Sequence, residues 1–280
     1  WSSDVCSSDL VPSLQGKTIV NLFFENSTRT RISFELAQKR LSADTVNFSA
    51  STSSLKKGES FKDTTQNIEA MKIDAVVMRH PDPGAPLHLT KHVDAIIINA
   101  GDGKHEHPTQ AILDMMSLKE VFGKIKGLNV ALVGDISHSR VALSNIYGLI
   151  TLGANVTVCG PPTLIPPHIK SLGVNVSHNL DEAIEWADAL NILRIQMERM
   201  GVGLFPSVRE YREVFGVNTE RLERHNKELI IMHPGPMNRG IEIDSTVADS
   251  KQAIILDQVL NGVASRMAIL YLLLGGKSEE

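Results

Sequence analysis

Three hydroxyl side chains and two arginines gather in the segment "ENSTRTR" at positions 25–31, between a strand-like run and a helix-like run. A helix N-terminus carries unpaired N–H groups and a partial positive charge, so it binds anions readily. Ser27, Thr28 and Thr30 add hydroxyl donors. Arg29 and the arginine two residues later add guanidinium groups that match phosphate oxygens. With no Walker loop or GxGxxG fingerprint in the chain, the segment predicts a small-anion site. A capped helix with solvated arginines is the alternative.

Two further motifs place polar side chains after apolar runs. "VMRHP" puts Arg79 at the end of a strand, and "GDGKHEHPTQ" puts His107 and Gln110 at the start of a helix. Parallel sheets form their ligand crevices at such strand ends. We expect His107 to donate a hydrogen bond to a carbonyl oxygen that becomes an oxyanion, with a helix-capping histidine as the alternative. The HxH spacing of His105 and His107 could suggest a metal, but no clear third ligand is nearby, so we predict none.

The second half of the chain repeats this placement. Arg140 follows a strand in "VGDISHSR", Arg194 and Gln196 follow another in "NILRIQMERM", and two prolines shape the loop "MHPGPMNRG" after a third. One surface arginine would mean little. Four arginines at strand ends, counting Arg29 and Arg79, predict a cleft between two domains that binds anionic groups from both sides.

The elements that must position these residues alternate between strand-like and helix-like runs, which is typical of α/β domains with parallel sheets. Predicted strands span residues 18–24, 74–79, 94–99, 129–135, 155–160, 189–194 and 229–236. Predicted helices span residues 32–41, 60–71, 108–122, 139–153, 181–187, 208–215 and 258–276. The alternation restarts after a short Gly/Lys-rich stretch at 123–127, which predicts two α/β domains of similar size.

Composition limits the class of protein. A chain of 280 residues with 42% apolar content can form one or two globular domains. Its net charge of −4 argues against general nucleic-acid binding, and it has no apolar run of about 18 residues that would indicate a membrane span. Its two cysteines, Cys6 and Cys159, form no disulfide framework, so we expect a cytoplasmic protein. The first ten residues are Ser/Asp-rich and unlike the rest, and we expect them to be an artefact outside the fold.

Six motifs, taken together and in order, resemble the catalytic chains of bacterial aspartate carbamoyltransferase. They are "FFENSTRTRISFE", "SSLKKGES", "VMRHP", "HPTQAILDM", "LRIQMERM" and "HPGPMNRGIEI", and the match spans about residues 11–276. The resemblance implies a carbamoyltransferase fold with the substrate cleft between two domains. It places residues 1–122 and the C-terminal helix 259–280 in a carbamoyl-phosphate-binding domain, and 123–258 in an aspartate-binding domain.

The resemblance also implies the roles of the site residues. The residues that bind carbamoyl phosphate would be Ser27, Thr28, Arg29, Thr30, Arg79, His107 and Gln110. Thr30, Arg79 and His107 would contact the carbamoyl carbonyl, and Gln110 the carbamoyl amine. Backbone carbonyls near the loop Pro234, Gly235 and Pro236 would contact the carbamoyl nitrogen. The residues that bind L-aspartate would be Lys57, Arg140, Arg194 and Gln196, and the catalytic set would be His107, Arg79, Thr30 and Lys57.

Lys57, with Ser53 or Ser54, would reach into a neighbouring chain's site, which implies a homotrimer. A regulatory or dihydroorotase-like chain is a possible further partner. The family normally begins with a helix ahead of the "GKTIV" strand, and this helix is replaced here, so we expect the apolar faces that it covers to be exposed.

The implied reaction is attack of the α-amino group of aspartate on the carbamoyl carbon, with phosphate as the leaving group and no covalent intermediate or cofactor. A carbamoyltransferase for another amino acid is the first alternative. Lys57 and Arg194 favour aspartate, as does the "HPGP" loop at 233–236, where ornithine enzymes typically carry "HCLP". A non-catalytic paralogue that serves as a structural subunit is the second alternative.

Overall fold

The computed structural model describes residues 10–49, 63, 66–67, 69–196 and 207–275. The chain forms two compact units, the first of residues 1–109 with 260–280 and the second of residues 110–259. The domain limits expected from the sequence differ mainly in placing residues 110–122 with the first domain, and they stay a prediction.

The first unit is built on a parallel four-stranded sheet with the order β2-β1-β3-β4. Its strands are β1 (Thr18–Phe23), β2 (Asp44–Ser49), β3 (Ala75–His80) and β4 (Ile96–Asp102). The helices along this part of the chain are α1 (Thr28–Arg40), α3 (Ala85–Leu89) and a short 3-10 turn, η2 (Pro12–Leu14). Because β1, β3 and β4 are parallel neighbours, their carboxyl ends lie side by side along one edge.

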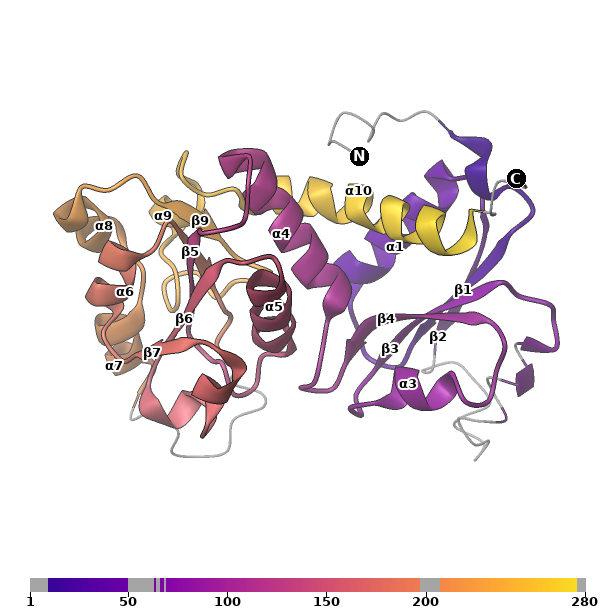
Figure 1. The fold of residues 1–280 in the computed structure, drawn as a ribbon, viewed down its shortest axis with the longest axis horizontal. Coiled ribbons are helices and arrows are strands. Elements are labelled where there is room, and N and C mark those ends of the chain that lie inside the picture. The colour runs from indigo at the N-terminus through magenta and orange to yellow at the C-terminus, as the bar shows by residue number, and fades with distance from the viewer. Residues whose placement is uncertain (1–9, 50–62, 64–65, 68, 197–206, 276–280) are drawn as a thin grey trace. The chain divides into compact units, whose positions relative to one another are not determined.

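Alternate residues of these strands face two hydrophobic layers. One layer packs Ile19 of β1 and Val77 of β3 against Phe34 of α1 and Met267 of α10 (Ile255–Leu274). The other packs residues of the same strands against Leu89 of α3. Figure 1 shows the same arrangement, with α1 and α10 on one side of the sheet and α3 on the other. Helices on both faces are the expected cover for a parallel sheet.

The second unit is built on a parallel five-stranded sheet with the order β7-β6-β5-β8-β9. Its strands are β5 (Asn129–Val133), β6 (Asn155–Cys159), β7 (Asn175–Ser177), β8 (Ala189–Ile192) and β9 (Ile230–Met232). The chain's other helices are α4 (Pro108–Phe122), α5 (Arg140–Thr151), α6 (Leu180–Trp186), α7 (Val208–Phe215), α8 (Thr219–His225) and α9 (Ser245–Ala248). Two 3-10 turns, η5 (Pro162–Leu164) and η6 (Ile169–Leu172), follow β6.

This sheet is also covered on both faces. Leu132 of β5 packs in one layer with Ile146 of α5, and Val133 packs in the other with Ile184 of α6 and Phe215 of α7. Figure 1 shows α5 on one side of β5 and β6, and α6 and α7 on the other. The two sheets confirm the predicted architecture of two parallel-sheet α/β domains.

Most predicted elements are present, with ends shifted by a few residues. Predicted helix 108–122 is α4, and predicted helix 208–215 is α7. The sequence reasoning missed β2, β7, α3, α8 and α9. The predicted helix at 60–71 falls mostly outside the described residues. No helix in the part of the chain that the structure describes is long and apolar enough to cross a membrane.

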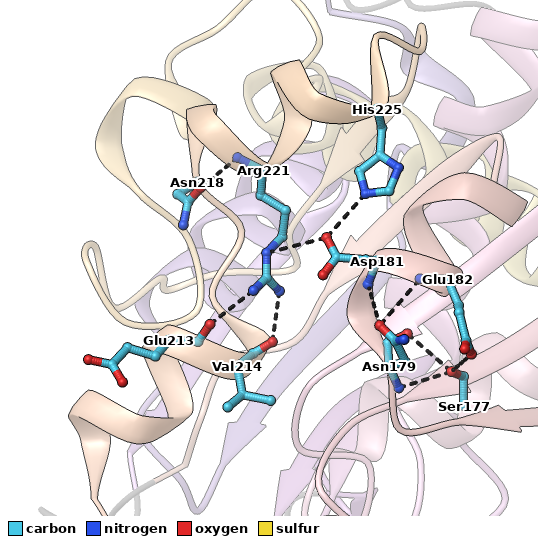
Figure 2. A network of polar contacts seen from close by, with 9 residues as sticks. All are labelled: Ser177, Asn179, Asp181, Glu182, Glu213, Val214, Asn218, Arg221 and His225. Carbon is cyan, nitrogen blue, oxygen red and sulfur yellow. Dashed lines mark hydrogen bonds and ion pairs between the residues drawn. The ribbon is translucent and has the colours of Figure 1, made fainter.

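A network of polar contacts ties together three helices of the second unit (Figure 2). Arg221 of α8 is 7% exposed, and its guanidinium donates to the carbonyl oxygens of Val214 (2.7 Å) and Glu213 (2.9 Å) at the end of α7. The same side chain lies 3.7 Å from the Asp181 carboxylate of α6, which also accepts from His225 at 3.1 Å. Arg221 therefore satisfies the last carbonyls of one helix and pairs with the first turn of another.

Replacing Arg221 with alanine is expected to lower the free energy of unfolding of the second unit by about 2 kcal/mol, because several charge-assisted hydrogen bonds are lost together. Chemical denaturation followed by circular dichroism measures the change. Arg224→Ala, on the exposed face of the same helix, is the matched control and should change the stability by less than about 0.5 kcal/mol. Equal losses in the two variants would remove the structural role of the network.

Candidate active site

The turn between β1 and α1 presents the predicted anion-binding residues. Ser27 is the N-cap of α1 with an extended backbone, and its side chain makes no capping hydrogen bond. The Ser27 hydroxyl therefore does not cap α1 in the usual way, which disfavours the alternative of an ordinary capped helix. Thr30 is 7% exposed in the first turn of α1, and Thr28 and Arg29 are exposed beside it. The start of α1 therefore offers hydroxyl groups and a guanidinium next to backbone N–H groups.

Arg79 lies next to this turn because β1 and β3 are paired. Phe23 and Arg79 are partners in the sheet register, and the N–H of Phe24 donates to the Arg79 carbonyl oxygen at 2.9 Å. The Arg79 guanidinium donates to the carbonyl oxygen of Ala100 on β4 at 3.1 Å and lies 3.4 Å from the Glu25 carboxylate. The neighbouring strand and the acidic residue of "ENSTRTR" therefore both orient this arginine.

The loop after β4 is organised by one buried carboxylate. Asp102 is 1% exposed and accepts from the N–H groups of Gly84 and Glu106, the amide of Asn99 and the ring of His105. Burial acts to raise the pKa of Asp102, but these hydrogen bonds outweigh it and hold the pKa below its usual value. His105 is thus part of the loop's internal structure. No group of three potential metal ligands occurs among the described residues, and the prediction of a metal-free site stays a prediction.

His107 closes this loop and directly precedes α4, which begins at Pro108. It is 5% exposed, and its Nδ1 lies 3.5 Å from the hydroxyl oxygen of the buried Thr109. The strand order β1-β3-β4 therefore brings the 27–30 turn, Arg79 and His107 to adjacent strand ends of one sheet. This edge combines anion-binding groups with a buried imidazole that can act as a donor.

The turn after β5 positions Arg140 in the second unit. Gly134 has φ +122°, and a Cβ atom there would lie 2.8 Å from the carbonyl oxygen of Leu193, so only glycine fits. The carboxylate of the fully buried Asp135 accepts from the backbone N–H of His138 at 3.1 Å and binds its ring at 2.9 Å. Arg140 follows as the first residue of α5 and is 5% exposed.

Arg194 and Gln196 follow the adjacent strand, β8. Gln196 donates from Nε2 to the carbonyl oxygen of His138 at 3.1 Å, which joins this segment to the turn that carries Arg140. Arg194 is half-buried between Leu193 and Ile195, whose side chains are fully buried. The register of β5 and β8 thus places two arginines and a glutamine at one edge of the second sheet.

The loop after β9 lies next to this edge and is held by a buried histidine. His233 is 1% exposed, its Nδ1 accepts from the N–H of Gly235 at 2.8 Å, and its Nε2 lies 3.4 Å from the Glu242 carboxylate. Glu242 also accepts from the N–H of Asn238, whose side chain donates to the Ile195 carbonyl oxygen at 3.1 Å. The backbone of Pro234 and Pro236 is therefore held in a defined path beside Arg194.

Gln110 belongs to a separate buried cluster in the second unit. It donates from Nε2 to Asp114 at 2.9 Å, one helical turn later in α4. Asp114 is fully buried, and burial raises its pKa to about 6, while hydrogen bonds from four side-chain amides act against that rise. The group is therefore mainly a carboxylate at neutral pH.

The structure thus gathers the predicted residues in two places. The first unit groups Ser27, Thr28, Arg29, Thr30, Arg79 and His107, and the second groups Arg140, Arg194, Gln196, Pro234, Gly235 and Pro236. Lys57, Ser53 and Ser54 lie outside the described residues. Burial raises the pKa of Cys159 to about 12, so this thiol is unsuited to act as a nucleophile.

Sequence reasoning missed the carboxylates that support these residues. They are Glu25, Asp102, Asp114, Asp135 and Glu242. Asp114 could have been noticed from its spacing of four residues from Gln110, which puts the two side chains on one helix face. The other carboxylates lie in turns or at strand ends, where the spacing alone does not show which nearby side chains and N–H groups they bind.

Comparison with known proteins identifies the family. Residues 3–120 match the family model described as the carbamoyl-P binding domain of aspartate/ornithine carbamoyltransferase, and residues 126–273 match its Asp/Orn binding domain. A relative from Christiangramia forsetii, named aspartate carbamoyltransferase catalytic subunit, is 65% identical over 94% of this chain and 85% of its own length.

Solved structures agree with this match. Aspartate transcarbamoylase from Trypanosoma cruzi, in complex with carbamoyl phosphate and aspartate, is similar with a TM-score of 0.85 and 33% identity, over 94% of this chain and 86% of that one. Ornithine carbamoyltransferase from Pyrococcus furiosus is similar with a TM-score of 0.83 and 29% identity, over 96% and 88%. Both halves of the chain and nearly its whole length therefore match one group of enzymes, and the chain belongs to the aspartate/ornithine carbamoyltransferase family.

Proposed function

We propose that this protein transfers the carbamoyl group of carbamoyl phosphate to the amino group of L-aspartate, giving N-carbamoyl-L-aspartate and phosphate. This reaction is an early step of pyrimidine biosynthesis. The observation that carries the proposal is the edge formed by β1, β3 and β4, where a hydroxyl-rich helix start, Arg79 and buried His107 lie at adjacent strand ends. The choice of aspartate is supported by the 65% identity to a relative named for that substrate, against 29% to the ornithine enzyme.

The first unit supplies the groups for carbamoyl phosphate in this proposal. Ser27, Thr28 and Arg29 bind the phosphate together with the N–H groups of α1. Thr30, Arg79 and His107 contact the carbamoyl oxygen. The contacts of Arg79 with Ala100 and Glu25 support its role, because an arginine that is already oriented loses little conformational freedom when the substrate binds.

The second unit supplies the groups for aspartate and for the carbamoyl nitrogen. Arg140 and Arg194 bind carboxylates, since planar guanidinium groups match carboxylate geometry, and Gln196 assists them. The backbone carbonyls near Pro234 and Gly235 accept from the carbamoyl nitrogen, as does the side chain of Gln110.

The chemistry is direct transfer. The amino group of aspartate, in its neutral form, attacks the carbamoyl carbon, and the carbonyl oxygen becomes an oxyanion. The bond to the phosphate oxygen then breaks, the carbonyl re-forms, and the leaving phosphate takes the proton that the attacking nitrogen loses. Donors aimed at the oxyanion lower the barrier, and orientation of the two substrates can contribute roughly 7–11 kcal/mol. Neither a metal nor a cofactor is part of the proposal.

Phosphate release by the purified chain tests the proposed function. Carbamoyl phosphate is supplied with L-aspartate, with L-ornithine, or without an acceptor. We expect rapid phosphate release only in the assay that contains L-aspartate. Phosphate release only in the assay with L-ornithine would show that ornithine, and not aspartate, is the acceptor. A folded chain that binds carbamoyl phosphate but transfers the carbamoyl group to neither amino acid would support a non-catalytic subunit.

The proposal extends to a homotrimer in the cytoplasm, in which Lys57 completes the site of a neighbouring chain, with a regulatory or dihydroorotase-like chain as a possible further partner. Mixing Arg29→Ala chains with Lys57→Ala chains should then restore activity, because each mixed trimer contains one site with both native residues. The expected recovery is up to about one third of the wild-type rate in mixed trimers isolated by two affinity tags. Mixed trimers as inactive as either parent would show that the site is not shared.

A further inference from the structure

One buried carboxylate in the second unit collects four side-chain amides from four elements. Asp114 of α4 is fully buried. Its Oδ1 accepts from Nε2 of Gln110 (2.9 Å) and Gln258 (2.8 Å), and its Oδ2 accepts from Nδ2 of Asn145 (2.9 Å) and Asn191 (3.2 Å). These donors stand on α4, α10, α5 and β8. The proposed chemistry has given Asp114 no role.

The carboxylate determines which way the Gln110 amide faces. An ionised carboxylate can only accept hydrogen bonds, so the NH₂ end of Gln110 must point toward Asp114. The carbonyl oxygen of Gln110 is then the end left for a ligand. That oxygen is an acceptor, which suits a substrate amine and does not suit a substrate carbonyl.

The same oxygen of Asp114 also orients the side-chain amide of Gln258. Gln258 donates to Asp114 with its NH₂ end, so its carbonyl oxygen faces the other way and accepts from the N–H of His233 at 2.9 Å. The His233 ring in turn accepts from the N–H of Gly235 at 2.8 Å. One carboxylate therefore holds both Gln110 and the start of the 234–236 loop, whose backbone carbonyls are the other proposed acceptors for the carbamoyl nitrogen.

We propose that Asp114 is a positioning residue that turns the Gln110 carbonyl and the 234–236 loop toward the carbamoyl NH₂ group, and so selects a substrate that carries an amine at that position. This inference rests on the proposed function, because it assigns the selectivity of the same site. It predicts discrimination between carbamoyl phosphate and acetyl phosphate, in which a methyl group replaces the amine. A methyl group cannot donate to the oriented oxygens, which lose their contact with water when it binds.

The test is Asp114→Asn, which keeps the shape but puts an NH₂ group where one carboxylate oxygen was. At least one facing amide must then turn round. The measured quantity is the ratio of the inhibition constant of acetyl phosphate to the KM of carbamoyl phosphate. We expect this ratio to fall about tenfold, since one or two hydrogen bonds to the amine are lost while the methyl compound loses none.

Two comparisons separate orientation from simple damage to the fold. In the Gln110→Ala background, Asp114→Asn should change the ratio much less than in the wild type, because the amide that it turns is gone. The matched control is Asn145→Ala, which removes a donor from the other carboxylate oxygen and leaves Gln110 held. This control should lower stability without changing the ratio.

A measurement on the wild type covers the case in which Asp114→Asn does not fold. The side-chain NH₂ of Gln110, assigned in nuclear magnetic resonance spectra by its loss in Gln110→Ala, should keep its shift when acetyl phosphate binds, because that end faces Asp114. A large shift of these protons, or equal effects of Asp114→Asn with and without Gln110, would overturn the orientation. Wild-type enzyme that transfers to no amino acid would overturn the proposed function instead, and this inference with it.

Discussion

Replacing His107 with alanine is expected to lower kcat by about 10²–10³-fold, the usual cost of losing one oxyanion donor. The affinity for carbamoyl phosphate should change much less, because the phosphate contacts at the start of α1 remain. The physical reason is the position of this imidazole: it is 5% exposed, directly precedes α4, and follows the strand that is paired with the strand of Arg79. A donor held there stabilises charge that develops only in the transition state.

Steady-state kinetics with a binding measurement for carbamoyl phosphate would test this expectation. His105→Ala is the informative control, because it lies two residues away and its ring binds Asp102 within the same loop. If disturbance of the loop were the cause, both histidine variants would lose turnover equally. A His107→Ala enzyme with normal kcat would remove the oxyanion role.

Replacing Arg194 with alanine is expected to raise the KM for L-aspartate by about 10–100-fold, with a small effect on the KM for carbamoyl phosphate. The loss corresponds to one or two charge-assisted hydrogen bonds of about 1.5–3 kcal/mol in total. Arg194 follows β8 beside Gln196, and that segment is joined to the Arg140 turn through the His138 carbonyl oxygen. The strand end that carries Arg194 is therefore held by hydrogen bonds, and the Arg194→Ala variant removes one positive charge from it.

Two further variants test whether the guanidinium group of Arg194 itself causes this change in KM. Arg194→Lys keeps the charge without the planar pair of donors, so it should recover only part of the aspartate affinity. Arg212→Ala removes a surface arginine that pairs with Asp244 in the same unit, and it should leave the KM for aspartate unchanged. An Arg194→Ala enzyme with unchanged KM for aspartate would exclude this residue from the carboxylate site.

The parts of the fold that were predicted correctly are those whose apolar pattern is strong. Buried strands such as β5 read as continuous apolar runs, and Pro108 marks the start of α4. The edge strand β2 was missed because "DTVNFS" mixes polar and apolar residues, as a partly exposed strand does. The short α8 was missed for a related reason, since most of its residues are polar and its buried residue is Arg221, a charged side chain.

The candidate site divides in the same way. Groups that would meet the substrates, such as Arg79 and His107, stand at strand ends and could be found from motifs. The groups that hold them could not, because Asp114 and Glu242 find their partners through tertiary packing. A carboxylate that binds amides from four elements leaves no local signature beyond its spacing from Gln110. The role of Lys57 stays a prediction, since that residue lies outside the part of the chain that the structure describes.

A competition between acceptors tests the central claim most directly. The purified chain is given carbamoyl phosphate with L-aspartate and L-ornithine at equal concentrations, and the products are identified by mass spectrometry. The proposed function predicts N-carbamoyl-L-aspartate as the sole carbamoylated product, together with an equal amount of phosphate. Carbamoylated ornithine as the main product would contradict the assignment of Arg140 and Arg194 to the carboxylates of aspartate.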